Sequence, residues 1–274
     1  MNETILTIQN LNKSYRSSVI ALRDLNLAVP KGLIFGFVGP NGAGKTTTIN
    51  ILANILKRDS GEIDLFGKPI TEKSYRYKAR TGFVLERPTF IEKLSVKEYL
   101  TFAGAMYGLE EKEVKQRADE LIDFFELKDK QDEWIETYSA GMKKKVSMSA
   151  ALIHNPEFLV LDEPFEGMDA IAINKTKKLF LELKQKGTTI LITSHILSYV
   201  ENLCDEVAII HKGQIVYQNT IENIQSEFKE QLAQDPKLSA LEEIFLSLVG
   251  EADEAKQSLS WLEEKDEESE KLNH

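Results

Sequence analysis

The sequence has little of what a disulfide-bonded, metal-clustered or membrane-spanning chain needs. It contains one cysteine, Cys204, among 274 residues, which excludes an internal disulfide and a cysteine-based metal cluster and fits a reducing compartment. We interpret Cys204 as a core residue without chemistry of its own. No apolar run approaches the roughly 18 residues that span a bilayer. The first residues also lack the basic-then-apolar order of a signal peptide, so we expect neither export nor a membrane span.

Basic residues are fewer than acidic ones. The chain has 34 Lys and Arg against 44 Asp and Glu, a net charge of -10, which argues against binding nucleic acid through general attraction to phosphates. Residues 251–274 account for -6 of this charge, with nine acidic side chains and three lysines, so the body is near-balanced. Composition favours a disordered solvating tail, and the alternative is a helix that Trp261 anchors on a partner.

Hydrophobic periodicity divides the body into strands and helices. The first thirty residues alternate apolar and polar side chains, which predicts short antiparallel strands, and residues 33–38 form the apolar run of a strand buried on both faces. A helix is expected over about 45–56, with buried strands at 158–161 and 188–193 and a hairpin turning at Lys212-Gly213. Strands separated by helices predict an α/β fold with a largely parallel core sheet.

Residues 95–154 have a helical pattern instead. Val96 and Leu100 begin one apolar face, and Ala118 and Ile122 begin another. This pattern predicts a helical insert of about sixty residues. After residue 220 come polar helical segments with one more apolar stripe (Leu241, Ile244, Phe245 and Leu248).

A glycine-rich loop follows the first buried strand. Its sequence, Gly39-Pro-Asn-Gly-Ala-Gly-Lys-Thr46, fits G-x-x-x-x-G-K-[ST] and lies between a strand and a helix, as this phosphate-binding motif requires. Its glycines let backbone N–H groups turn inward around an anion, and the helix adds its positive end. Lys45 can reach the β- and γ-phosphates and Thr46 can bind Mg²⁺. The loop predicts nucleoside triphosphate binding without choosing among kinases, GTPases and ATPases.

Two adjacent carboxylates, Asp162 and Glu163, end a later buried strand. The aspartate can hold Mg²⁺ and the glutamate can polarise an attacking water. Alone, the pair fits an ordinary acidic turn equally well. Its position favours the catalytic interpretation over the acidic turn. The pair follows the helical insert, and the segment Tyr138-Ser139-Ala140-Gly141-Met142 lies just upstream.

With these motifs the chain resembles the ATP-binding subunit of an ATP-binding cassette (ABC) transporter, over about residues 3–220 and with every motif in family order. The resemblance implies a P-loop NTPase (RecA-like) core with a mainly parallel sheet, an antiparallel β subdomain and a helical insert subdomain at about 88–155. Residues 1–230 would form the ATP-binding domain, and 231–274 a helical extension with an acidic tail. The implied ligands are ATP and Mg²⁺.

The resemblance also implies the site residues. Catalytic roles fall to Glu163, His195 and Lys45. ATP contacts would come from an adenine-stacking aromatic, the phosphate loop and the signature segment of a second subunit (Tyr15, Gly39, Pro40, Asn41, Gly42, Ala43, Gly44, Lys45, Thr46, Thr47, Ser139, Ala140 and Gly141). The implied Mg²⁺ residues are Thr46, Glu86 and Asp162. Residues 166–169 correspond to the loop that contacts the second subunit.

Several positions depart from the commoner family pattern. Glu86 replaces a glutamine, Ala140 a glycine, Met142 a second glutamine and Glu166 a serine or threonine. Together with residues 241–250, this variant resembles the ATPases of simple bacterial exporters for drugs, lantibiotics or sodium. The lysines at 143–145 we interpret as a solvated helix face.

The resemblance implies a head-to-tail dimer, with two identical chains expected, on a separate integral membrane permease at the cytoplasmic face of the cell membrane. We expect no nucleic-acid partner. Cassettes of DNA repair or translation differ by long coiled-coil inserts or paired cassettes, and a small-molecule kinase would not explain residues 138–142 or His195. A regulatory ATP binder with poor hydrolysis stays open because of Glu86 and the altered signature. Cargo and transport direction are not encoded in these motifs.

Overall fold

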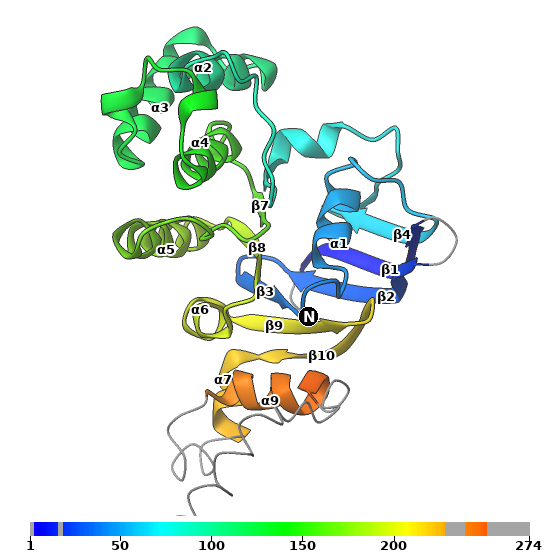
Figure 1. Ribbon diagram of the computed structural model, residues 1–274. Helices are drawn as coiled ribbons and strands as arrows, with labels where there is room; N and C mark the ends of the chain where they lie inside the picture. Colours follow the sequence, from blue (N-terminus) through cyan, green and yellow to red (C-terminus); the bar gives the residue numbers. More distant parts are fainter. Residues whose placement is uncertain (1–2, 16–18, 228–238, 251–274) are drawn as a thin grey trace, which may run out of the picture.

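The computed structural model describes residues 3–15, 19–227 and 239–250, which form two sheets and several layers of helices (Figure 1). The central sheet has the order β10-β9-β3-β8-β7-β6. All neighbours in it are parallel except β10 at the edge, which is antiparallel to β9. The largely parallel core sheet is thereby confirmed. Its strands are β3 (Ile34–Val38), β6 (Thr81–Val84), β7 (Phe158–Leu161), β8 (Thr189–Ser194), β9 (Glu206–His211) and β10 (Gln214–Thr220).

Strand β3 is buried along its whole length. Because successive side chains of a strand point to opposite faces, Ile34 and Val38 join the core under the helices of the insert and the C-terminal part. Phe35 and Phe37 join a second core on the opposite face. The continuous apolar run therefore belongs to a strand covered on both sides, as its sequence predicts.

The second core is shared with a separate antiparallel sheet of order β2-β1-β4-β5. Its strands are β1 (Thr4–Tyr15), β2 (Val19–Pro30), β4 (Ser60–Leu65) and β5 (Lys68–Pro69). β1 and β2 are antiparallel as expected, but they are twelve residues long rather than short. Helix α1 (Lys45–Leu52) packs its apolar side chains into the same core. It ends earlier than expected, because Asn54 adopts a left-handed φ of 55° that a helix cannot continue through.

The helical insert stands at one end of the central sheet (Figure 1). It contains α2 (Val96–Met106), α3 (Glu111–Phe124) and α4 (Ala140–Leu152), with 3₁₀ turns at Lys128–Lys130 and Ile135–Thr137. Another 3₁₀ turn, Arg76–Arg80, precedes β6. Ser95 begins α2 with a reciprocal cap, since its hydroxyl accepts from the Glu98 N–H and its own N–H donates to the Glu98 carboxylate. The apolar face predicted from Val96 and Leu100 is buried.

Helices α5 (Ala170–Gln185) and α6 (Leu197–Leu203) lie along one side of the central sheet, and α7 (Ile221–Glu227) and α9 (Ala240–Val249) lie beyond β10 (Figure 1). Leu241 and Ile244 are buried as predicted, but Val249 occupies the buried position expected for Leu248. The hairpin turns at Lys212 and Gly213, which both have positive φ. The acidic tail and Trp261 lie outside the described residues.

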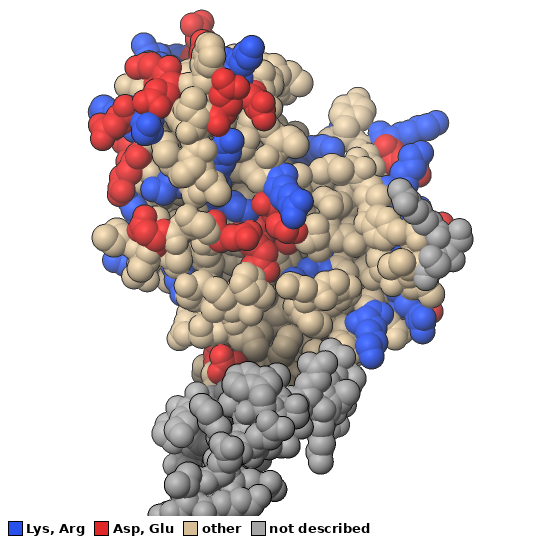
Figure 2. Space-filling view, in the orientation of Figure 1, with Lys and Arg blue, Asp and Glu red and all other residues tan. Residues whose placement is uncertain are grey.

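Charged side chains of both signs are interspersed over the helical insert, whereas much of the surface over the sheets is uncharged in the same view (Figure 2). The mixture agrees with the near-balanced charge of the body. None of the helices in the described part of the chain combines the length and apolarity that crossing a membrane requires.

Candidate nucleotide-binding and catalytic site

The phosphate loop leaves the carboxyl end of β3 and enters helix α1. Gly44 precedes this helix with a φ of 118°, and a Cβ atom there would lie 2.8 Å from the Ala21 carbonyl oxygen, so the position accepts only glycine. The free N–H groups and positive end of α1 make the loop an anion site. Loop and facing side chains enclose a cavity of about 400 Å³, lined by Asn41, Gly42, Ala43, Gly44, Lys45, Thr46, Thr47, Glu86, Glu163, Glu166 and His195.

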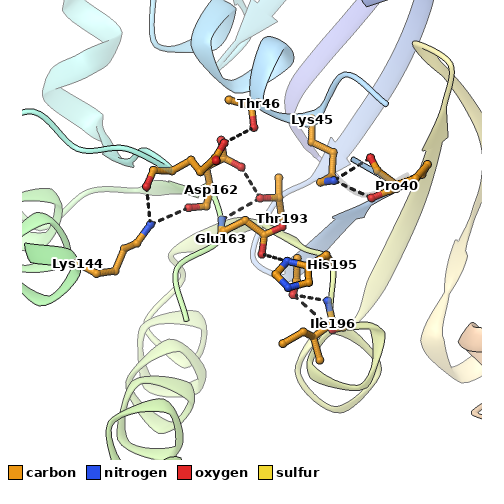
Figure 3. A network of polar contacts seen from close by, with 12 residues as sticks. Pro40, Lys45, Thr46, Lys144, Asp162, Glu163, Thr193, His195 and Ile196 are labelled. Atoms are coloured by element: carbon orange, nitrogen blue, oxygen red, sulfur yellow. Dashed lines mark hydrogen bonds and ion pairs between the residues drawn. The ribbon is translucent and has the colours of Figure 1, made fainter. Parts of the chain in front are cut away.

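Lys45 is buried within this loop. Its Nζ donates to the carbonyl oxygens of Gly39, at 2.7 Å, and Pro40, at 3.2 Å (Figure 3). Burial lowers the pKa of the Lys45 ammonium, and the carboxylates of Glu163 and Asp162 oppose that shift. The loop therefore holds a preorganised cation, which can pair with a phosphate group.

Asp162 directly follows strand β7 and is 1% exposed. The Thr193 hydroxyl, on the neighbouring strand β8, donates to Asp162 Oδ1 at 2.6 Å and accepts from the Glu163 N–H at 3.0 Å (Figure 3). Burial raises the pKa of Asp162, while the hydrogen bond from Thr193 opposes the rise. Asp162 Oδ2 is buried and has no hydrogen-bond partner in the described part of the chain. Such an oxygen calls for a further ligand.

Two other oxygen-bearing side chains lie beside it. Thr46 Oγ1 donates to Glu86 Oε2 at 3.2 Å, and Figure 3 places Thr46 next to Asp162. Mg²⁺ binds oxygen ligands, commonly one or two carboxylates with waters and substrate phosphates. The unpartnered Oδ2 of Asp162, the Thr46 hydroxyl and the Glu86 carboxylate fit that requirement.

Glu163 and His195 also line the cavity. His195 Nδ1 is 3.0 Å from Glu163 Oε2, and the glutamate is mostly buried whereas the histidine is exposed. Glu163 has a left-handed φ of 46°, a conformation that is strained for a residue with a side chain. The bond from its N–H to Thr193 helps hold that conformation. The result is a carboxylate oriented by an imidazole, which is suited to polarise a water molecule.

Tyr15 lies at the end of β1, beside the phosphate loop. Its hydroxyl is 3.4 Å from Thr47 Oγ1, and the side chain is 40% exposed. An exposed aromatic ring at the rim of a phosphate site can stack against a nucleotide base.

The signature residues lie apart from this cavity. Ser139 begins α4, and its Oγ accepts from the Met142 N–H at 3.3 Å. Ser139 and Ala140 are exposed, and neither they nor Gly141 lines the cavity of the same chain. The structure thus assembles the phosphate loop, Glu86, Asp162, Glu163 and His195 but leaves the signature facing outward.

In this region, one expectation from the sequence is wrong, and one residue was missed. The lysines at 143–145 do not form a uniformly solvated face, because Lys144 is 4% exposed and points into the protein. It shares the inner side of α4 with Ser147 and Ala151, which are also buried. The spacing of residues 144, 147 and 151 places them on one helix face, and this pattern indicates burial. The charge of the three adjacent lysines led instead to the expectation of a solvated face. Thr193 was missed because its role depends on the strand order, which no local pattern encodes.

Comparison with known proteins agrees with this geometry. A family model described as ABC transporter matches residues 22–166. The chain is 34% identical over 242 residues to the linearmycin resistance ATP-binding protein LnrL of Bacillus subtilis (strain 168), covering 88% of this chain and 78% of that protein. It is 35% identical over 230 residues to the bacitracin transport ATP-binding protein BcrA of Bacillus licheniformis, covering 84% and 74%. A solved structure of an ATP binding subunit of an ABC transporter has a TM-score of 0.75 at 31% identity, covering 82% of this chain and 93% of the other.

Proposed function

Because this chain belongs to the ABC transporter family as an ATP-binding, ATP-hydrolysing subunit, we propose that two copies enclose two ATP molecules head to tail and drive a separate membrane permease. The observation that carries this proposal is the incomplete cavity. One chain supplies the phosphate loop, Glu163 and His195, but its Ser139–Gly141 segment lies outside the cavity lining. A second chain placed head to tail completes both sites.

ATP then joins the two chains. Lys45 and the loop N–H groups hold the β- and γ-phosphates, and Tyr15 stacks on the adenine. The capped N-terminus of the partner's helix α4 offers Ser139 and free N–H groups to the γ-phosphate. Because ATP contacts both chains only in the closed dimer, it shifts the population towards that state.

Hydrolysis would use residues already arranged around the cavity. A Mg²⁺ ion held by Thr46, Asp162 and Glu86 would neutralise charge on the phosphates. Glu163 orients the attacking water, His195 fixes Glu163 and reaches the γ-phosphate, and Lys45 stabilises the charge that develops on the leaving group and transferred phosphoryl oxygens. Loss of the bridging phosphate removes the contact between the chains and reopens the dimer.

The permease has a candidate docking site beside Glu86. A cavity of about 290 Å³ lies between the loop after Glu86 and the insert, and its lining is mainly apolar (Ala53, Ile55, Lys78, Phe83, Leu85, Pro88, Thr89, Phe90, Tyr99, Ala103, Tyr107, Ser147, Ala150 and Ala151). Its connection to Glu86 would transmit changes at the nucleotide to the bound permease, at the cytoplasmic face of the membrane. The names of the two relatives, linearmycin resistance and bacitracin transport, support a bacterial exporter of small molecules.

The test is ATP turnover and oligomeric state of the wild type beside Glu163→Gln. We expect the variant to lose at least about 100-fold in turnover, because general base catalysis contributes that much. It should also accumulate as a dimer with ATP but not with ADP, as followed by size-exclusion chromatography with light scattering. Glu182→Gln, on the exposed side of α5, should behave like the wild type. A Glu163→Gln variant that stays monomeric with ATP would contradict the homodimer.

A further inference from the structure

A buried lysine connects helix α4 to the two strand ends that bear the metal-side carboxylates. The Nζ atom of Lys144 lies 3.3 Å from the Leu85 carbonyl oxygen, 3.2 Å from that of Glu86 and 3.4 Å from that of Asp162. Figure 3 shows Lys144 pointing towards Asp162. An ammonium group has three donors, so all of them can engage these three carbonyls. Two of the carbonyls directly follow β6, and the third directly follows β7.

The surroundings of Lys144 are acidic. Burial lowers the pKa of the Lys144 ammonium, and the carboxylates of Glu166, Asp162, Glu163 and Glu86 oppose that shift. A buried charge is tolerated only when it is hydrogen-bonded and electrostatically compensated. Lys144 therefore lowers the repulsion among carboxylates gathered at one site, and Glu86 adds one of those negative charges where a glutamine would be neutral.

The two buried lysines of the site have different tasks. Lys45 donates within the phosphate loop and lines the cavity. Lys144 does not line it, and its bonds go to the backbone behind the carboxylates. Lys144 is therefore placed to act on the position of Glu86 and Asp162 and not on the nucleotide itself.

We propose that Lys144 is a positioning residue for ATP hydrolysis, which fixes the backbone of Glu86 and Asp162 to helix α4. Lys144 lies about one and a half turns from Ser139 on that helix. Lys144 thereby holds Glu86 and Asp162 of one chain in a fixed position relative to the Ser139–Gly141 segment of the same chain, and the three form one rigid unit. This inference rests on the proposed dimer for one consequence only, namely that the unit couples one ATP site to the other.

The test compares Lys144→Met, Lys144→Gln and Lys144→Arg with Lys143→Met. Lys143 is half-buried on the same helix and makes no side-chain hydrogen bond among the described residues, so it is a matched control. Three quantities are measured: the kcat for ATP, the KM for ATP and the amide hydrogen exchange of residues 85–87 in nucleotide-free protein. Thermal unfolding verifies that each variant is folded.

We expect Lys144→Met to lower kcat by about tenfold or more, the effect of losing a charge-assisted hydrogen bond, while KM changes less than about threefold because the phosphate loop is untouched. Amide exchange of residues 85–87 should accelerate by about tenfold for the same reason. Lys144→Arg, which keeps the charge and donors, should recover most of both losses. Lys143→Met should stay within about twofold of the wild type, as expected for a side chain without such bonds.

A Lys144→Met variant that melts earlier but matches Lys143→Met in kcat and in exchange would reduce Lys144 to a structural residue and overturn the proposal. If this variant does not fold, Lys144→Gln against Lys144→Arg carries the same comparison, and equal kcat and exchange in the two overturn it. If the wild-type chain itself does not turn over ATP, the self-sufficient homodimer fails. Amide exchange at residues 85–87 then decides the role of Lys144 independently of ATP turnover.

Discussion

The buried histidine His154 shows how the surroundings of a single residue set its protonation state. His154, just beyond helix α4, is 9% exposed and stacks on Tyr107 with ring centroids 3.7 Å apart. Burial lowers its pKa to about 4, and the positive charge of Arg117 acts in the same direction. His154 is therefore neutral in the folded protein at neutral pH, in the region where the insert meets the central sheet.

This residue predicts an acid-sensitive fold. The unfolded chain takes up a proton at His154 near pH 6.5, but the folded chain only near pH 4. The contribution of neutral His154 to the free energy of unfolding is therefore fully present above pH 6.5 and is lost as the pH falls towards 4. At pH 5 the loss is about 2 kcal/mol. Urea unfolding at pH 7 and pH 5 measures this loss. His154→Phe keeps a ring for Tyr107 but cannot titrate, so it should lose about 2 kcal/mol less than the wild type between the two pH values. Equal losses would contradict the assignment.

At the scale of elements, the sequence was informative wherever the deciding pattern is local. The apolar run of β3, the stripe of α2 and the Lys212-Gly213 hairpin were all predictable, because each depends on neighbours within one element. The order of strands was not, because β7 lies between β6 and β8 through contacts distant in sequence. Thr193 meets Asp162 across 31 residues only as a result of that order.

Helix α4 and the loop after β7 also make a contact that the sequence does not reveal. A Cβ atom on Gly141 would lie 2.2 Å from the Gly167 carbonyl oxygen. Since that oxygen belongs to backbone, either the first turn of α4 or the 163–169 loop would have to shift. The signature is therefore packed against the loop that leads into α5.

Gly141→Ala should accordingly destabilise the fold by about 1–3 kcal/mol, because the strain of overpacking exceeds the helix propensity that alanine adds. The loss is measured by denaturant unfolding. Gly250→Ala is the matched control, since its Cβ would meet Leu246 only at 3.9 Å, in ordinary contact, and it should be neutral or slightly stabilising. Gly141→Ala with wild-type stability would show that the contact relaxes without strain.

At the scale of the whole molecule, the site is split between two regions of the surface. The phosphate loop, Glu86 and Glu163 line one cavity, while Ser139 at the start of α4 is exposed and does not line it. A head-to-tail dimer requires each Ser139 to act on the nucleotide of the other chain. A substitution at Ser139 should then affect assembly without affecting ATP binding by the monomer.

Ser139→Glu tests this separation when it is combined with Glu163→Gln. The added carboxylate would face the γ-phosphate held by the partner, and two like charges at contact distance repel each other strongly. We expect the ATP-dependent dimer of Glu163→Gln to disappear in the double variant, as measured by light scattering. The affinity of the monomer for ATP should stay within about twofold, because the altered residue does not line its own cavity. Loss of ATP binding by the monomer would mean that Ser139 serves its own site.

Helix α1 has a consequence that reaches beyond catalysis. It starts at the phosphate loop, and its apolar residues lie in the core shared by the antiparallel sheet and the central sheet. A ligand bound to the loop therefore contacts the helix that joins the two sheets. Its binding free energy adds to the free energy of unfolding of the part that contains both sheets. At a ligand concentration of 100 times Kd this amounts to about 2.7 kcal/mol. The nucleotide thus also stabilises the contact between the two sheets, and this stabilisation is reversible. When the nucleotide dissociates, unfolding should first become less cooperative at the contact between the antiparallel sheet and the central sheet.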